Sequence, residues 1–422
     1  MDLDEFLEDV PDNRAADIRR LAKERSYGIT RYLEDVETRF QTVVGDEPSF
    51  GSTAPEIFVG RFGYPQVSAG ILSPVGQEDQ AEVFRTDSTW YEDRLGIGSI
   101  VERRTSLLNA RDRVDVNVAD AWEGSIGVQR EVAIADSPVD VEVDLADRPE
   151  FTLDVEGERV PPIGPRAGVR SLELGENPHV PRAVERTISD DDWHATGAMV
   201  YLFRQGFDVY EINSILSAGT LGRTDQRRLV PTRWSITAVD DTVGQYLRGS
   251  IRSNPSIDQT KVHFNEYIGN RYWVILTPGQ WEYELVEMKG PGSVWNPDQG
   301  SHWLGSAYEG ATGRTSYVDE TAGAYYAARL AVLEHLREVG RQAKALVLRE
   351  VTDDYWAPVG VWQVREAVRG ALSDGSMEVG IAEGFIPAAQ GVLRELPLDP
   401  DQIIRKSTML QGRQSQLRDF SR

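Results

Sequence analysis

The chain contains 422 residues, of which 40% are hydrophobic and 27% are charged, so it is long enough for two or three domains with a sizeable buried core. It carries 45 basic and 68 acidic residues, a formal net charge of −23, which argues against a protein that coats nucleic acid or an anionic membrane through general basicity. The absence of cysteine excludes disulfides, thiol catalysis and cysteine-ligated zinc or iron–sulfur sites, and no apolar run reaches the roughly 18 residues of a membrane-spanning helix.

The first part of the chain combines helical and extended patterns. Residues 12–44 predict one long amphipathic helix, because apolar side chains recur every three or four positions. From Glu47 to Pro74, glycines and prolines separate short apolar runs, which predicts strands and tight turns. Residues 139–145 alternate valine or leucine with acidic residues, the pattern of a half-exposed strand. Pro161–Pro181 is rich in proline and glycine and predicts a long ordered loop.

The middle of the chain predicts a helix, a hairpin and a boundary. The cluster Ser189–Asp192 offers several N-cap side chains for a helix over residues 195–203. Residues 262–278 predict a β-hairpin, with Gly269-Asn270 as a two-residue turn that needs positive φ. Gly290–Gly313 is rich in glycine and proline and predicts a domain boundary or a large functional loop.

Two helices are predicted further on, over residues 319–349 and 362–372. Strands and helices do not alternate regularly, so the fold class is α+β (mixed) rather than a doubly wound sheet. We expect a large α+β region over residues 1–300, a smaller and mainly helical region over 301–400, and a flexible tail over 401–422.

The densest basic cluster is Arg223, Arg227, Arg228 and Arg233, in a segment that also holds Trp234. Arginine forks match phosphate oxygens and an indole ring stacks on a base, so the cluster predicts a site for DNA or a nucleotide. The alternative is a set of internal ion pairs with the acidic surplus of the chain, and the sequence leaves both interpretations open.

Three further basic or aromatic residues are candidates for the same site. Arg61 and Tyr64 stand beside Gly60 and Gly63, where a glycine-lined backbone can approach a phosphate, although the glycines equally predict tight turns. Lys289 precedes a glycine-rich run but lacks the spacing of a phosphate-binding P-loop.

A polar string precedes the predicted helix that begins near residue 319. It consists of Glu309, Arg314, Tyr317 and Glu320, and it predicts either a nuclease-like or nucleotide-hydrolysing site or the capping and ion pairs of a helix start. None of the five histidines stands at a metal-ligand spacing, so no metal site is predicted. The sequence identifies no cofactor.

A partner-binding motif lies near the carboxy-terminal end. Gln414, Leu417 and Phe420 have the spacing Q-x-x-L-x-x-F, which is typical of the box by which replication and repair proteins bind a sliding clamp of the proliferating cell nuclear antigen type. A short helical turn directs the two apolar side chains into one pocket while the glutamine hydrogen-bonds beside it. Ser421 stands where a second aromatic anchor is usual, which predicts weakened binding. A chance match is the alternative.

Three segments together resemble the archaeal Nre family of DNA-repair proteins. They are Phe58–Pro65 (FVGRFGYP), the arginine-rich run from Gly222 through Leu229–Thr237 (LVPTRWSIT), and Tyr308–Tyr317 (YEGATGRTSY). The resemblance spans nearly the whole chain and implies a role in repair of DNA damage together with a sliding clamp, by an activity that it does not name. Some members of the family carry a cysteine-rich zinc module near the amino terminus, which this chain cannot build.

The basic residues are unevenly divided. Five are lysines, which leaves 45 − 5 = 40 arginines. This acidic, lysine-poor composition resembles that of cytoplasmic proteins from salt-in halophilic archaea, in which molar salt screens the repulsion among surface carboxylates. The acidic amino terminus is unlike a secretory signal, so we expect a cytoplasmic protein.

Two hypotheses follow for the function. The first is a repair factor that is recruited to the clamp and binds DNA through the arginine-rich site. The second is a repair enzyme, a nuclease or nucleotide-processing enzyme, with its site built from the glycine-rich and arginine-rich segments. Convergence of the candidate residues in one deep pocket would favour the enzyme, and an open surface would favour the binding factor.

Overall fold

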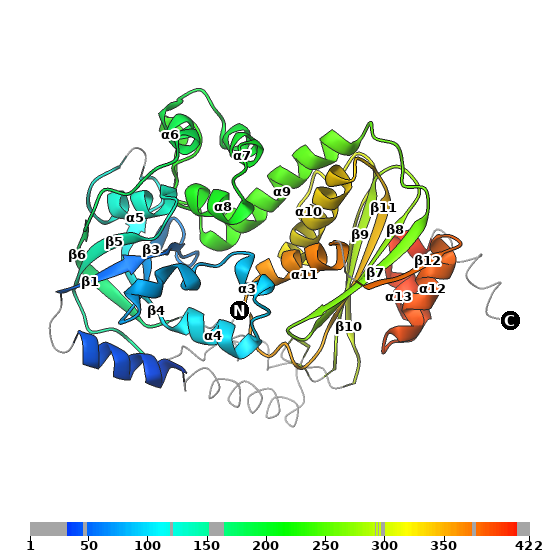
Figure 1. Ribbon diagram of the computed structural model, residues 1–422, viewed down its shortest axis with the longest axis horizontal. Coiled ribbons are helices and arrows are strands. Elements are labelled where there is room, and N and C mark those ends of the chain that lie inside the picture. The colour runs from blue at the N-terminus through cyan, green and yellow to red at the C-terminus, as the bar shows by residue number, and fades with distance from the viewer. Residues whose placement is uncertain are drawn as a thin grey trace. The chain divides into compact units, whose positions relative to one another are not determined.

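The computed structural model describes residues 32–44, 49–118, 121–151, 164–291, 293, 295–296, 300–373 and 377–411, which form two compact units (Figure 1). The first unit contains the described residues up to Trp90 and Gly98–Thr242. The second contains Tyr91–Ile97 and the described residues from Val243 onward. Each unit is built on a mixed sheet covered by helices, so the α+β class is confirmed.

The first unit contains a six-stranded sheet in the order β1-β5-β6-β4-β3-β2. Among the strands that the structure describes in this sheet, β4 and β6 are parallel and the other neighbouring pairs are antiparallel. The strands are β1 (Ser49–Ala54), β2 (Glu56–Val59), β3 (Gln66–Pro74), β4 (Leu107–Asp115), β5 (Val139–Leu145) and β6 (Arg166–Leu174). The helices that lie wholly or partly in this unit are residues 32–43, η1 (Glu78–Phe84), α3 (Thr89–Glu92), α4 (Ile97–Thr105), α5 (Gly124–Ile134), α6 (Arg182–Ser189), α7 (Ala195–Arg204), α8 (Val209–Ser217), η2 (Thr224–Gln226) and α9 (Thr232–Ile251). Of these, α3, α4 and α9 also include residues of the second unit.

Two helices supply much of the apolar cover of this first sheet. Phe40 in the helix over residues 32–43, and Val128 and Val132 in α5, join a core with Ile71 and Leu108 of the sheet. The helix predicted over residues 12–44 is thus present from residue 32, and its earlier part lies outside the described residues. This core holds the hairpin β2–β3, which carries part of the candidate site described below.

The second unit contains a six-stranded sheet in the order β10-β9-β11-β8-β7-β12, with helices on both faces (Figure 1). Side chains of α12, α13 and α14 pack in one core with Ile275, Val286 and Leu346 of the sheet. The strands are β7 (Thr260–Tyr267), β8 (Asn270–Thr277), β9 (Glu282–Lys289), β10 (Trp303–Glu309), β11 (Lys344–Val351) and β12 (Met377–Ala382). The helices are α10 (Ala322–Glu338), α11 (Trp362–Leu372), α12 (Phe385–Glu395), α13 (Pro400–Lys406) and α14 (Thr408–Gln411).

Several elements agree with the sequence prediction. The alternating segment forms β5, whose Val139, Val141 and Val143 are buried while its acidic residues face outward. The predicted strands between Glu47 and Pro74 are β1, β2 and β3. The helix predicted over residues 362–372 is α11. In these segments the hydrophobic period alone specifies the element.

The predicted helix over residues 319–349 is wrong in its second half. Helix α10 ends at Glu338, Gly340 adopts a φ of +65°, and Lys344–Val351 forms the strand β11. This strand lies between β8, to which it is antiparallel, and β9, to which it is parallel. Its side chains are buried on both faces of the sheet. Its continuous apolar run also satisfies a helical period, which explains the error.

Two expectations for loops are corrected as well. The segment Pro161–Pro181 contains the strand β6, in which Ala167, Val169 and Leu172 are buried. The segment Gly290–Gly313 contains the strand β10, which pairs with β9. In both segments glycines and prolines at the ends mask a strand between them.

Two local details also differ from the prediction. The β7–β8 hairpin turns at Ile268-Gly269, both with positive φ, one residue earlier than Gly269-Asn270. Helix α7 begins after His194 without a side-chain cap, and Asp190 instead accepts from the N–H of Asp192. The domain division expected near residue 300 stays a prediction. The two compact units divide the chain after Trp90, Ile97 and Thr242. Among the described residues, no helix is long and apolar enough to cross a membrane.

Candidate nucleic-acid interface

Two segments that the sequence singles out, around Arg61 and around Arg233, lie side by side in the first unit. The first is the loop between the antiparallel strands β2 and β3, and the second is the start of α9. The N–H of Val59 donates to the Oγ1 of Thr232 at 3.0 Å, and the Thr232 and Ser217 hydroxyls are 3.2 Å apart. The Thr232 hydroxyl therefore joins the end of β2 to the first residue of α9.

The β2–β3 loop is a tight turn that depends on glycine. The N–H of Gln66 donates to the carbonyl oxygen of Gly63 at 2.9 Å. Gly63 has a φ of +79°, and a Cβ at this position would lie 2.1 Å from Nη2 of Arg113. The guanidinium of Arg113, which comes from β4, thus lies directly against the loop and occupies space that only a glycine leaves open.

Three aromatic rings are exposed on this part of the first unit. Phe62 is 78% exposed, Tyr64 is 48% exposed, and Trp234 in the first turn of α9 is 44% exposed. The Tyr64 and Trp234 ring centroids are 5.3 Å apart with an interplanar angle of 50°. A single exposed ring is ordinary on a protein surface, but a group of exposed rings is typical of a contact site.

Three arginines accompany the rings. Partial burial, followed by the positive charge of Arg233, lowers the pKa of Arg61, so the two guanidinium groups lie within electrostatic reach of each other. Cζ of Arg61 lies 4.8 Å from the Phe62 ring centroid. Among the described residues, Arg61, Arg113 and Arg233 form no ion pair with a carboxylate. We call Arg61, Phe62, Tyr64, Arg113, Arg233 and Trp234 the arginine–aromatic surface.

The predicted site residues near this surface have different environments. Arg228 is exposed, and its charge contributes to the lowered pKa of Asp115, after the hydrogen bonds from Asn117 and Gln66. Arg223 is exposed and pairs with Asp225 at 3.5 Å.

Arg227 differs from its neighbours because it is buried, with 4% of its surface exposed. Its Nε donates to the carbonyl oxygen of Gly222 at 3.0 Å and its Nη2 to that of Ile188 at 2.5 Å. These bonds hold the arginine-rich segment against the end of α6, and they leave no exposed guanidinium for a phosphate.

Sequence reasoning missed Phe62 and Arg113 as members of the surface. Phe62 adjoins Arg61, but nothing in its surroundings distinguishes an exposed ring from a core ring. Arg113 reaches the loop only because β3 and β4 pair with Ser68 opposite Arg113. The sequence carries no signal for that register.

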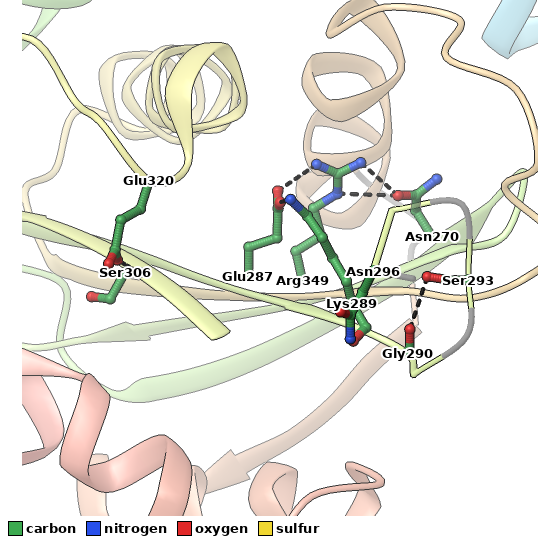
Figure 2. Close-up of polar contacts among 9 residues, drawn as sticks. All are labelled: Asn270, Glu287, Lys289, Gly290, Ser293, Asn296, Ser306, Glu320 and Arg349. Atoms are coloured by element: carbon green, nitrogen blue, oxygen red, sulfur yellow. Dashed lines mark hydrogen bonds and ion pairs between the residues drawn. The ribbon is translucent and has the colours of Figure 1, made fainter. Parts of the chain in front are cut away.

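Lys289, which belongs to the second unit, is engaged in a polar cluster (Figure 2). Its Nζ lies 3.1 Å from Oε1 of Glu287 and 3.7 Å from the ring centroid of Trp303. Glu287 also accepts from Nη1 of Arg349 at 2.6 Å, and Arg349 donates twice to Oδ1 of Asn270, at 3.1 and 2.7 Å. Lys289 is therefore one of two cations around a buried carboxylate, in a network that spans β8, β9 and β11.

The polar string around Arg314 divides into separate contacts, also in the second unit. Glu309 is fully buried and pairs with Arg329 at 2.9 Å. Arg314 donates from Nη1 to the carbonyl oxygen of Tyr308 at 2.8 Å. Glu320 accepts from the N–H of Ser306 at 2.8 Å (Figure 2). It also pairs with Lys406 at 2.6 Å.

Two further expectations concern metals and the clamp motif. Within the described ranges, no three His, Asp or Glu side chains lie together as metal ligands. Gln414, Leu417 and Phe420 lie outside the described residues, which end at Gln411.

The chain matches two family models. The model described as archaeal Nre, N-terminal, covers residues 21–296, and the model described as archaeal Nre, C-terminal, covers residues 309–420. No solved structure matches the chain significantly.

Curated relatives match over most of their length. A protein of Haloferax volcanii named DNA repair protein NreA is 55% identical over the whole of both chains. Two proteins of Archaeoglobus fulgidus are also similar. The one named DNA repair protein NreA is 40% identical over 81% of this chain and 83% of its own length, and the one named DNA repair protein NreB is 37% identical over 88% and 91%.

Proposed function

Because the chain belongs to the archaeal Nre family, we propose that it takes part in DNA repair and contacts DNA through the arginine–aromatic surface. The name DNA repair protein is carried by relatives that match at least 81% of this chain, which supports the first half of the proposal. The second half rests on one observation. Two exposed and adjacent rings, Tyr64 and Trp234, stand among arginines that have no carboxylate partners in the described part of the chain.

This combination suits single-stranded or unpaired DNA. Exposed rings stack on unpaired bases with little dependence on sequence, at about 1–3 kcal/mol per base, while guanidinium groups contact the phosphates between the bases. Arg61 and Arg233 repel each other, and a bound phosphate would relieve that repulsion. A chain with a net charge of −23 repels DNA elsewhere on its surface, so a local patch of this kind is needed to bind it.

Stacking matters all the more if the protein works at high salt. Counterion release, which drives most phosphate binding, falls steeply with salt concentration. Ring stacking and directed arginine hydrogen bonds lose much less, because they act at contact distance. The proposed surface supplies both of these interactions.

The test is binding of a fluorescent single-stranded oligonucleotide to full-length protein, measured by anisotropy at high salt. We expect Arg61→Met with Arg233→Met, and separately Trp234→Leu, to weaken binding by about 1–3 kcal/mol each. The matched control is Arg170→Met, an exposed arginine of the same unit that pairs with Asp144. Equal affinity of all these variants and the wild type would contradict the proposed surface.

We further propose that Gln414, Leu417 and Phe420 recruit the protein to a sliding clamp. The spacing of these residues supports the proposal, as does their position directly after an anchored segment. The buried Glu284 carboxylate accepts from the Ser407 hydroxyl at 2.7 Å and from the N–H groups of Thr408 and Met409 at 2.7 and 2.8 Å. The motif therefore starts within a few residues of a fixed point on the second unit.

Calorimetry of a tail peptide with the clamp of the same organism tests the recruitment. Phe420→Ala is expected to abolish binding, because it removes the aromatic anchor, and Ser421→Phe is expected to tighten it by adding a second one. Equal binding of the wild-type and Phe420→Ala peptides would contradict the clamp motif and leave the DNA-binding surface untouched.

A further inference from the structure

Two arginine side chains contact glycines at or near the second half of α9, in the second unit. Arg329 of α10 packs against Gly244, where a Cβ would lie 2.9 Å from its Nη2. One turn further along α9, the guanidinium of Arg248 lies against Gly313, where a Cβ would lie 1.9 Å from its Nη1. Gly244 and Arg248 are four residues apart, so these two arginine contacts lie on one face of α9. The ribbon of α9 runs beside that of α10 (Figure 1).

A third arginine joins them at the ring of Tyr325. Cζ of Arg314 lies 5.9 Å from the centroid of this ring, and Cζ of Arg329 lies 5.7 Å from it. Arg314 directly follows Gly313, so the segment Gly310–Ser316 connects the group to Arg248. Three positive charges thus gather around one ring and one short loop.

The carboxylate beside these arginines, that of Glu309, already has partners. Glu309 binds Arg329 at 2.9 Å and accepts from Nε1 of Trp281 at 2.8 Å, and it is fully buried. Arg314 donates to the carbonyl oxygens of Tyr308 and Ser316, and Arg248 forms no ion pair in the described part of the chain. Two of the three positive charges therefore lack a counter-charge.

Arg248 has a buried donor with nothing to bind. Its Nη1 is shielded from solvent and has no hydrogen-bond partner among the described residues. The buried Arg349, by contrast, uses its nitrogens on Glu287 and Asn270. A buried and unpaired guanidinium N–H is costly, and proteins retain such groups mainly where a ligand satisfies them.

The rim of the loop has the groups that a nucleotide would use. Thr312, Thr315 and Ser316 are exposed on either side of Arg314. Tyr317 is 56% exposed, and its ring stacks on Tyr326 at 5.5 Å. Hydroxyl groups beside arginines suit phosphate oxygens, and an exposed ring suits a base.

We propose that Arg248, Arg314 and the loop Gly310–Ser316 bind the phosphate monoester of a nucleotide, with the Tyr317 ring against its base. The phosphate comes either from a free nucleotide or from the end of a DNA strand, and both present the same dianion. The site uses residues of the second unit alone, so it does not rest on the arginine–aromatic surface.

The test is calorimetric titration of full-length protein, at a salt concentration that keeps it folded, with dAMP, with inorganic phosphate, and with an oligonucleotide carrying a 5′-phosphate or a 5′-hydroxyl. We expect Arg248→Met to lower the affinity for the phosphate-bearing probes at least about tenfold. The melting temperature should stay near that of the wild type, because Nη1 of Arg248 has no hydrogen-bond partner among the described residues to lose. Arg394→Met, an exposed arginine on α12, is the control.

A second pair of variants tests the loop without touching the charge. Gly313→Ala places a methyl group where the guanidinium of Arg248 lies and should weaken dAMP binding to the same degree. The control is Gly391→Ala on α12, outside the proposed site, where an added Cβ would meet nothing within 4 Å, and this variant should leave dAMP binding unchanged.

Each result of the titration has one meaning. An Arg248-dependent preference for dAMP identifies a free nucleotide as the ligand, and one for the 5′-phosphorylated oligonucleotide identifies a strand end. Absence of binding by every phosphate probe, or equal binding by wild type and Arg248→Met, would overturn the site. Loss of stability in Arg248→Met with unchanged phosphate affinity would assign the arginine a purely structural role.

Discussion

Arginines that look alike in one short segment differ sharply in their surroundings. Arg227 is buried and bonded to two carbonyl oxygens, whereas Arg233, six positions later, is exposed at the start of α9. Both were candidates for phosphate contact, and their spacing could not separate them, because burial is decided by α6 and by the turn at η2. The sequence shows that a residue is charged, but it does not show whether that residue is exposed.

This difference predicts opposite behaviour on mutation. Arg227→Met should lower the free energy of unfolding by about 2–3 kcal/mol, because a buried charged hydrogen-bond donor is lost and two carbonyl oxygens are left without it. Arg233→Met should leave the free energy of unfolding within about 0.5 kcal/mol of the wild type. Denaturant titration of both variants measures the two values. Equal destabilisation by both substitutions would contradict the assigned environments.

The Glu287 carboxylate predicts an acid-dependent stability. Burial alone would raise its pKa, but the charges of Arg349 and Lys289 outweigh burial and hold it below the ordinary value of 4.5 (Figure 2). A carboxyl whose pKa is lower in the folded state stabilises that state above its unfolded pKa, and this stabilisation disappears as the pH falls through the folded value.

Stability of the wild type should therefore decline as the pH falls below about 4.5, and Glu287→Gln should flatten that part of the profile. The variant should be less stable than the wild type at neutral pH, because Arg349 remains buried without its counter-charge. Melting temperatures between neutral and acid pH give both profiles. Parallel profiles for the two proteins would contradict the assigned role of Glu287.

The sequence predicts a helix or a strand correctly where the spacing of its hydrophobic residues fits only one of the two. Strand β5 alternates strictly because one of its faces is buried, and α11 keeps a helical stripe. Strand β11 is buried on both faces, so its sequence fits a strand or a helix equally well. Pairing with β8 and β9 decides between them, and that information is spread over distant parts of the chain.

The sequence also predicted the segments of the candidate site but not how they come together. The loop around Arg61 and the start of α9 were both identified, but their contact through Val59 and Thr232 is a tertiary fact. Arg113 depends on the register of β3 against β4. Residues of a site can thus be proposed from their segments, whereas their grouping requires the fold.

The β2–β3 loop makes a prediction at this scale. Gly63→Ala combines a φ of +79° with a contact of 2.1 Å to Arg113, so it should cost about 1–3 kcal/mol of stability and displace Arg113 from the arginine–aromatic surface. Oligonucleotide affinity and unfolding free energy should fall together. Gly197→Ala is the control, since this helical glycine has open space around it and alanine should stabilise α7 by up to about 1 kcal/mol. Identical behaviour of the two alanine variants would exclude a special conformation at Gly63.

For the whole molecule, charge is the dominant feature. A net charge of −23 repels itself when it is unscreened, and 40 of the 45 basic residues are arginines because only five are lysines. Adaptation to high salt stays a prediction for this chain.

Folding should therefore require high ionic strength. The melting temperature should fall markedly as potassium chloride is reduced from about 3 M to about 0.1 M, because the Debye length grows from roughly 2 Å to about 10 Å. A melting series across that range, with sucrose added in a parallel series to separate charge screening from solvent exclusion, measures the effect. A melting temperature independent of potassium chloride would refute the expectation.

The most direct measurement of the proposed DNA contact is photochemical crosslinking of full-length protein to a single-stranded oligonucleotide that carries a photoreactive base, followed by peptide mapping. If bases stack on the arginine–aromatic surface, crosslinks will map to Phe62, Tyr64 and Trp234, and the Arg61→Met, Arg233→Met double variant will reduce their yield. Crosslinks that map to other parts of the chain, with these three rings unmodified, would contradict DNA binding at this surface.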